Sequence, residues 1–301
     1  MANKRIDEPT GTETVGHEWD GIEELDTPMP RWWLITLYIT IVWGVVYVVL
    51  YPAWPMLSQA TEGVLGWSSR GQLAAEMARE GDLKAPVLAA LAGVPIERLP
   101  ENGELMRQAV AGGRAAFRVN CVQCHGSGAA GGAGYPNLND DDWLWGGDLR
   151  AIEFTITNGA RQPGRDATRT SLMPTFGGGL LTSEQMSQVA DHVLSLSGKA
   201  RVNAAGAELF ATNCAACHGP AGRGDRTLGA PNLADAIWLY GGKKEDVVRQ
   251  VTTPRHGVMP AWHGRLDPAT IKMLAAYVHS LGGGEDFVEV AAQPAQSDDQ
   301  S

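Results

Sequence analysis

Hydrophobic residues are distributed unevenly along the chain, and the longest uninterrupted run lies at residues 32–51. These residues, WWLITLYITIVWGVVYVVLY, contain no charged side chain. A helix of this length, rising about 1.5 Å per residue, spans the ~30 Å hydrocarbon core of a bilayer, and the tryptophans at its ends suit the membrane interface. The alternatives are a buried core helix and a cleaved signal peptide. Because 31 mostly polar residues precede the run and no small-residue cleavage site follows it, the pattern predicts one permanent transmembrane helix.

After residue 103 the hydrophobic positions recur with helical spacing. Residues 104–120 and 204–213 are rich in helix-forming Ala, Leu, Glu and Arg. Two later segments, 182–196 and 267–281, each place four apolar residues on one helix face: Met186, Val189, Val193 and Leu196 in the first, and Ile271, Leu274, Val278 and Leu281 in the second. Loops rich in glycine and proline separate these segments. The pattern predicts an all-α fold.

The helical region contains two copies of one sequence pattern. Cys121-Val-Gln-Cys-His-Gly returns 93 residues later as Cys214-Ala-Ala-Cys-His-Gly, and further features recur in the same order. They are Pro136-Asn-Leu and Pro231-Asn-Leu, Trp143-Leu-Trp-Gly-Gly and Trp238-Leu-Tyr-Gly-Gly, and Leu172-Met-Pro and Val258-Met-Pro. Upstream, Gly113 and Phe117 match Gly206 and Phe210, where we expect the first helix of each copy to cross the last helix closely.

The repeat and the apolar run together predict the organisation of the chain. We expect an N-terminal tail at 1–31, a transmembrane helix at 32–51 and a connector at 52–103. Two tandem domains follow at 104–199 and 200–286, and residues 287–301 are expected to be a disordered tail because they are rich in Gln, Ser, Asp and Pro.

All four cysteines lie in Cys-x-x-Cys-His motifs, which are typical of covalent haem c attachment. Cys121 and Cys124, like Cys214 and Cys217, are spaced to bond the two vinyl groups of one haem, with the next histidine as an axial ligand of the iron. Zinc sites of four cysteines pair their motifs about 15–20 residues apart and need no histidine, and thioredoxin-like dithiols follow a strand. Two disulfides would leave the repeated histidines unexplained. The motifs therefore predict two covalently bound haems, with His125 and His218 on the irons.

A second axial ligand is expected for each iron, and methionine is the usual one for electron transfer because its thioether raises the reduction potential. Met173 lies 48 residues after His125, and Met259 lies 41 residues after His218, at matching places in the repeat. His256 and His263 flank Met259 and are the main competitors, but they have no counterpart near Met173. Irons held on both sides have no open position, which indicates electron transfer rather than oxygen chemistry on this chain.

Other repeated positions have structural interpretations. Trp143 and Trp238 are expected to line the haem crevices or to donate their indole N–H to a propionate. Arg161 and Arg255 are candidate propionate partners. We expect the side chains at the equivalent positions 192 and 277 to pack in the core or at the haem edge.

Charge and compartment limit the function further. The net charge of −10 argues against a nucleic-acid-binding protein, which carries a basic surface. In bacteria, haem c is attached outside the cytoplasmic membrane, so the domains after residue 51 should be periplasmic and the N-terminus cytoplasmic. Lys4, Arg5 and Arg31 before the apolar run, against only Arg70 in the twenty residues after it, agree with this orientation.

The N-terminal segment, together with the two motifs, resembles the dihaem subunit (CcoP or FixP type) of cbb3-type cytochrome c oxidase. The resemblance rests on His17-Glu-Trp-Asp-Gly-Ile22, on Pro28-Met-Pro-Arg-Trp-Trp33 and on Tyr51-Pro-Ala-Trp-Pro55, and it covers roughly residues 15–286. It implies two cytochrome c domains on a single-pass anchor in the bacterial inner membrane.

The resemblance also implies a role in the respiratory chain. The chain would accept electrons from a periplasmic donor cytochrome c. It would pass them to a mono-haem cytochrome c subunit or to the haem–copper catalytic subunit, which reduces oxygen to water and pumps protons. The alternatives are a free-standing membrane-anchored dihaem cytochrome and a dihaem peroxidase, which would need one iron without methionine.

Overall fold

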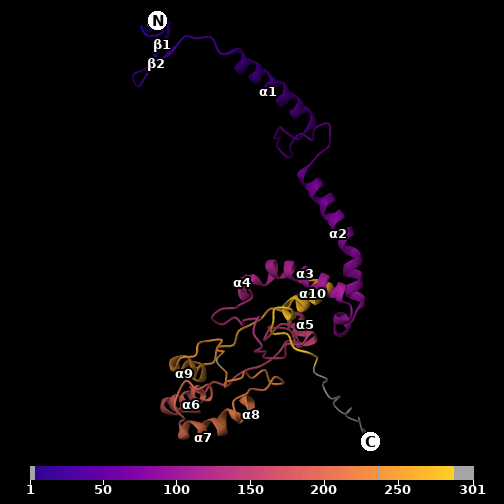
Figure 1. The fold of residues 1–301 in the computed structure, drawn as a ribbon, viewed down its shortest axis with the longest axis vertical. Helices are drawn as coiled ribbons and strands as arrows, with labels where there is room; N and C mark the ends of the chain where they lie inside the picture. The colour runs from indigo at the N-terminus through magenta and orange to yellow at the C-terminus, as the bar shows by residue number, and fades with distance from the viewer. Residues whose placement is uncertain (1–3, 236, 288–301) are drawn as a thin grey trace. The chain divides into compact units, whose positions relative to one another are not determined.

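The computed structural model describes residues 4–235 and 237–287, and the chain divides into two units, the first ending at Leu83 and the second beginning at Lys84 (Figure 1). The first unit holds the hairpin strands β1 (Thr14–Trp19) and β2 (Ile22–Leu25), the helix α1 (Arg31–Leu50) and most of α2 (Ser69–Gly93). The expected transmembrane helix therefore agrees with α1 to within one residue. Among the described residues, α1 is the one helix long and apolar enough to cross a membrane. The expected tail at 287–301 lies, after Phe287, outside the described residues.

The small hairpin in the N-terminal tail is a feature that the hydrophobic pattern did not predict. Asp20 and Gly21 form its turn with positive φ angles of 49° and 83°, which Asp-Gly pairs adopt in two-residue hairpin turns. Across the turn, Trp19 pairs with Ile22. The Asp20-Gly21 dipeptide is the one sequence signal for this hairpin, and it lies within a mostly polar segment.

The second unit is helical, as the sequence predicts. Its elements are η1 (Ile96–Glu101), α3 (Gly103–Asn120), α4 (Val122–His125), α5 (Leu149–Asn158), α6 (Ser183–Leu196), α7 (Ala204–Asn213), α8 (Ala215–His218), α9 (Lys244–Thr252) and α10 (Pro268–His279). The helix starts at Thr182 and Asp267 are confirmed, since each side chain accepts a hydrogen bond from a backbone N–H of the first turn.

These helices do not pack within their own repeat. Helix α10, the last helix of the second copy, lies against α3 and α5 of the first copy. Helix α6, the last helix of the first copy, lies against α7 and α9 of the second. Two hydrophobic cores result, one shared by α3, α5 and α10 and the other by α6, α7 and α9 (Figure 1).

The expected domains 104–199 and 200–286 follow the sequence repeat and stay a prediction, while the helices of each copy pack against helices of the other copy. The two copies exchange their C-terminal segments. Only six residues, 198–203, separate the end of α6 with its cap, Ser197, from the start of α7, so these neighbouring helices pack as a hairpin. Helix α10 then takes the equivalent place on α3, since both copies present the same kind of surface.

Each first helix crosses its partner through a glycine, as expected. A Cβ added at Gly113 would overlap the carbonyl of Met273 in α10, and one at Gly206 would overlap the carbonyl of Gln188 in α6. One turn further on, the ring of Phe117 lies 5.3 Å from that of Tyr277, and the ring of Phe210 lies 5.2 Å from that of His192. The close crossing is confirmed, but between the copies.

The connector is also part of the first core. Leu91, Ile96 and Leu99 are buried among the side chains of α3 and α10. The ammonium group of Lys272, itself buried in α10, donates to the carbonyls of Leu91 (2.7 Å) and Val94 at the end of α2. Lysine near a helix C-terminus satisfies its unpaired carbonyls and favours its dipole. The end of α2 is therefore fixed to the core shared by α3, α5 and α10.

Double-mutant cycles should detect the exchange. Replacing Phe117 and Tyr277 by leucine, singly and together, should reveal a coupling of about 0.5–1.5 kcal/mol in the free energy of unfolding, because the two rings are in contact. The same cycle on Phe117 and His192, which an unexchanged domain would bring together, should give a coupling near zero. Guanidinium unfolding followed by circular dichroism measures both. A coupling between Phe117 and His192, with none between Phe117 and Tyr277, would show that the helices of each repeat pack against one another.

Candidate haem-binding sites

Each Cys-x-x-Cys-His motif forms one tight helical turn directly after a first helix. The N–H of Cys121 donates to the carbonyl of Phe117 (2.8 Å), and that of His125 donates to the carbonyl of Cys121 (2.9 Å). The second motif repeats these bonds with Phe210, Cys214 and His218 at the same lengths. Residues three and four apart lie on one face of a helical turn, so both thiols and the imidazole of each motif face one side.

A glycine ends each of these turns. Gly126 and Gly219 have φ angles of 78° and 75°, which only glycine adopts readily. The sixth residue of the motif therefore reverses the chain beside the histidine, and the following loop returns beneath the imidazole ring.

The returning loop orients each histidine. The Nδ1 atom of His125 lies 3.1 Å from the carbonyl oxygen of Pro136, and that of His218 lies 3.1 Å from the carbonyl oxygen of Pro231. A carbonyl only accepts, so Nδ1 carries the proton and Nε2 has a free lone pair. Burial lowers the pKa of both imidazoles, which keeps them neutral. This is the arrangement of a histidine that ligates a metal through Nε2.

The two methionines lie in the opposite cores from those that their order in the chain suggests. Met259 packs against the core that contains Phe117, and its backbone N–H and C=O both pair with Ala160, each at 3.0 Å. Met173 packs against the core that contains Phe210 and Cys214. Each methionine therefore packs in the core of the other copy's motif, because it precedes the exchanged helix, and the pairing of the methionines with particular irons stays a prediction.

Equivalent backbone bonds secure the two exchanged segments. Three residues after Met259, the N–H of Trp262 donates to the carbonyl of Ile156 in α5 (3.1 Å). Three residues after Met173, the N–H of Phe176 donates to the carbonyl of Val251 in α9 (3.3 Å). The same contact thus forms twice, each time between the copies.

His256 lies where the two methionine segments cross. Its Nε2 atom accepts a hydrogen bond of 2.9 Å from the backbone N–H of Met173. His256 lies three residues before Met259, in the segment that carries that methionine. It therefore holds Met173, the methionine of the other core, in place. Its ring is engaged in that contact rather than free to compete with Met259.

Arg161 contacts both segments that carry the methionines. Its Nε atom donates to the carbonyl of Gly257 (2.5 Å), and its guanidinium lies 5.4 Å from the ring centre of Trp145. Arg255 stacks on the ring of Tyr240 at 4.5 Å. Both arginines have protein partners here, so their pairing with propionates stays a prediction.

Unpaired buried donors show where an anionic group fits. The indole N–H of Trp238 is buried without a partner, and so is Nε of Arg169. A buried donor of this kind needs an acceptor, and a haem propionate supplies one. Trp143 instead donates to the carbonyl of Gly283 (2.6 Å). The residues around the second motif therefore fit a bound haem, and Arg169, in the longer loop of the first copy, is a candidate that sequence reasoning missed.

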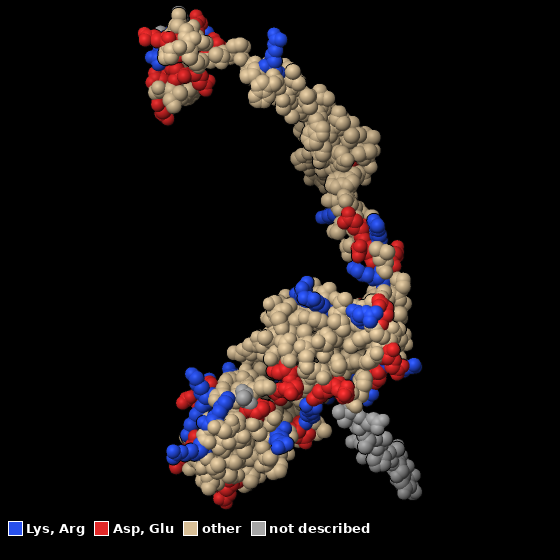
Figure 2. Space-filling model, in the orientation of Figure 1, with Lys and Arg blue, Asp and Glu red and all other residues tan. Residues whose placement is uncertain are grey.

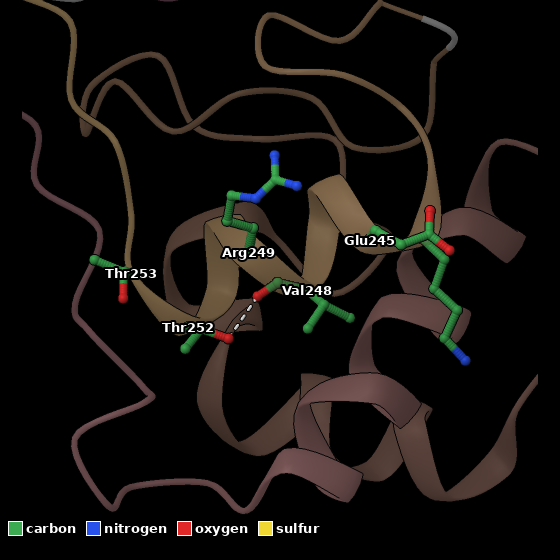
Figure 3. Close-up of a pocket in the computed structure, with 6 residues that line it drawn as sticks. Glu245, Val248, Arg249, Thr252 and Thr253 are labelled. Atoms are coloured by element: carbon green, nitrogen blue, oxygen red, sulfur yellow. Dashed lines mark hydrogen bonds between the residues drawn. The ribbon is translucent and has the colours of Figure 1, made fainter.

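The structure gives the alternatives less support. No disulfide joins the four cysteines, and burial raises the pKa of the Cys121 and Cys214 thiols to about 11. Within the described ranges, no group of three or more His, Cys, Asp and Glu side chains converges as a metal site would require. A hollow of about 450 Å³ lies along α9, lined by Lys244, Glu245, Val248, Arg249, Thr252 and Thr253. Figure 3 labels all of these except Lys244. None of these is a predicted haem ligand.

Known families match both parts of the chain. The model described as the N-terminal domain of cytochrome oxidase-cbb3, FixP, matches residues 11–58. The model described as cytochrome C oxidase, cbb3-type, subunit III, matches residues 108–193 and 201–278.

Similarity to individual proteins covers nearly the whole chain. The cbb3-type cytochrome c oxidase subunit FixP of Sinorhizobium medicae is 52% identical over 286 residues, which cover 94% of this chain and 99% of that protein. Subunit CcoP of Cereibacter sphaeroides is 52% identical over 276 residues, covering 90% and 95%. Subunit FixP of Azorhizobium caulinodans is 51% identical over 284 residues, covering 93% and 96%.

Substitution of His256 should weaken the support of Met173. His256→Leu leaves the N–H of Met173 without its acceptor, at a cost of about 1–3 kcal/mol. The methionine-to-iron charge-transfer band of the ferric protein should lose up to half of its intensity on mild heating. His256→Gln offers an amide oxygen and should restore the band, and His263→Leu should leave it unchanged. An intact band in His256→Leu would contradict this role.

Proposed function

Because this chain belongs to the family of cbb3-type cytochrome c oxidase subunits FixP and CcoP, we propose that it binds two haem c groups with exchanged axial ligands. His125 and Met259 would hold the iron of the haem attached at Cys121 and Cys124. His218 and Met173 would hold the iron of the haem attached at Cys214 and Cys217. The chain is an electron-transfer subunit of an oxidoreductase complex, and it contains cytochrome c domains with covalently bound haem c.

The residues support this assignment through geometry and chemistry. Haem c supplies a centre that takes up and releases one electron. The Pro136 and Pro231 carbonyls hold each imidazole with Nε2 free, and each methionine segment is fixed by backbone bonds to the facing helix. A thioether opposite an imidazole favours the reduced iron and raises the potential. Ligands on both sides leave no position for oxygen or peroxide, which suits electron transfer.

We further propose that the haem region is periplasmic and that the N-terminal hairpin is cytoplasmic. The apolar helix α1 is consistent with a single-pass membrane anchor. Lys4, Arg5 and Arg31 precede it, and positive charge favours the cytoplasmic side. Attachment of haem c outside the cytoplasmic membrane supports the same orientation.

The proposed partners follow from membership of the oxidase. Electrons would enter from a periplasmic donor cytochrome c. They would leave for the mono-haem cytochrome c subunit or the haem–copper catalytic subunit, where oxygen is reduced and protons are pumped. The observation that carries this proposal is the pair of Cys-x-x-Cys-His turns, each with an anchored histidine and a methionine in the same core.

Purification in mild detergent tests the assembly. The chain should co-purify with a haem–copper subunit and with oxygen consumption that depends on a reduced cytochrome c. An isolated dihaem chain without that activity would favour a free-standing electron shuttle. Peroxide turnover together with a high-spin haem would favour a peroxidase.

Marked haems should distinguish the ligand pairs. Cys217→Ser leaves one vinyl group of the second haem unreacted, which shifts its absorption and marks it in a redox titration. In that background, Met259→His should lower the potential of the unmarked haem by on the order of 100 mV, because imidazole stabilises the oxidised iron better than thioether does. Met173→His should lower the potential of the marked haem. The opposite assignment would overturn the exchange of ligands.

A further inference from the structure

The loop after the transmembrane helix folds back onto the end of that helix. Residues 52–67 leave α1 and return, so that the N–H of Val64 donates to the carbonyl of Val49 (2.9 Å) and that of Leu65 to the carbonyl of Leu50 (3.2 Å). These bonds satisfy two carbonyls that the helix end would leave unpaired. We call residues 52–67 the collar.

A glycine permits this close return. Gly63 has a φ of 70°, and a Cβ at this position would lie 2.5 Å from the carbonyl oxygen of Leu50. The collar is therefore held against the last turn of α1 by direct backbone contact, and it remains at the level where that helix ends.

Part of the collar's backbone is paired within the collar. Thr61 donates its N–H to the carbonyl of Trp54 (3.0 Å), and its hydroxyl accepts from the N–H of Trp54 (3.1 Å). The N–H of Met56 donates to the carbonyl of Gln59 (2.8 Å). Paired backbone groups lower the cost of moving a loop out of bulk water.

The large side chains that the collar exposes are mostly apolar. Leu57 is fully exposed, Val64 is 76% exposed and Met56 65%. Trp54, Leu65 and Trp67 are exposed as well, and Glu62 is the one charged residue in the segment. Figure 2 shows the stretch from α1 through this loop almost free of charged side chains. A cluster of exposed apolar side chains marks a surface that binds another protein or a membrane.

The collar also connects the anchor to the next helix. The ring of Trp67 meets that of Tyr51 edge-on at 5.8 Å, and its indole N–H donates to the side chain of Gln72 in α2 (2.9 Å). The position of the collar therefore determines where α2 begins relative to the end of α1.

We propose that the collar is a membrane-docking surface that lies in the interfacial layer of the phospholipid bilayer. It continues the surface of a membrane-spanning helix, and its backbone bonds to Val49 and Leu50 prevent it from leaving that level. Tryptophan and aliphatic side chains suit this layer, where water and headgroups can satisfy the backbone groups that the collar leaves unpaired. The collar fixes the depth of α1 and the point at which α2 leaves the membrane.

Spin-label depth measurements test the proposal in the full-length haem-loaded chain. Leu57→Cys and Val64→Cys introduce single labelling sites, since haem attachment occupies the four native thiols. The variants are labelled in nanodiscs of phosphatidylcholine and phosphatidylglycerol. Oxygen, which partitions into lipid, and a water-soluble nickel complex are then compared as relaxing agents. Val42→Cys within α1 is the lipid reference, and Glu208→Cys on α7 is the aqueous reference.

Labels on the collar should be relaxed more strongly by oxygen than by the nickel complex. Their ratio of oxygen to nickel relaxation should lie between those of the labels at positions 42 and 208. Stronger relaxation by nickel, as at position 208, would overturn the proposal. The proposal would also be overturned if the collar labels were exposed to water in nanodiscs and became protected only in the assembled oxidase. Another subunit, and not lipid, would then cover the collar. Label uptake by the unsubstituted chain would contradict haem attachment instead, so the two failures are distinguishable.

Discussion

Direct contact between helix backbones at Gly113 and Gly206 is the constraint on which the haem region depends. At each place a side chain would overlap a carbonyl of the crossing helix, so only glycine permits this approach of the first and last helices. Whichever copy supplies the last helix also supplies the methionine that precedes it. The composition of both candidate sites, and not only the packing of the cores, follows from which helices cross at these glycines.

The sequence predicted the elements better than their partners. The apolar run, the helical spacing and the helix starts at Thr182 and Asp267 are all found in the structure. The exchange could not be predicted, because a repeat gives both copies equivalent contact surfaces. Gly113 and Phe117 accept either last helix as far as residue types can tell. The short link between α6 and α7 was the available signal, and it favours packing between neighbours in the chain over packing between the ends of one copy.

The candidate site shows the same limit at the level of side chains. Residue types predicted His125 and His218 as iron ligands, and the structure adds what the motif did not predict, a carbonyl of Pro136 or Pro231 beside each imidazole. Residue types also suggested His256 as an iron ligand and Arg161 as a propionate partner. In the structure, both also bridge the crossing segments that carry Met173 and Met259. These contacts exist only because the segments exchange, so an unexchanged reading of the sequence could not reveal them.

The exchange also determines the order in which the chain can be completed during synthesis. The core around His125 needs α10, which is among the last parts of the chain to emerge, whereas α6 and α7 can pack as soon as both have been made. The second site is therefore the first whose helices are all present, and the first site waits for the C-terminal segment. A chain that terminates early lacks the partner helix of the earlier motif, so an intact C-terminus is a condition for a complete site near the start of the haem region.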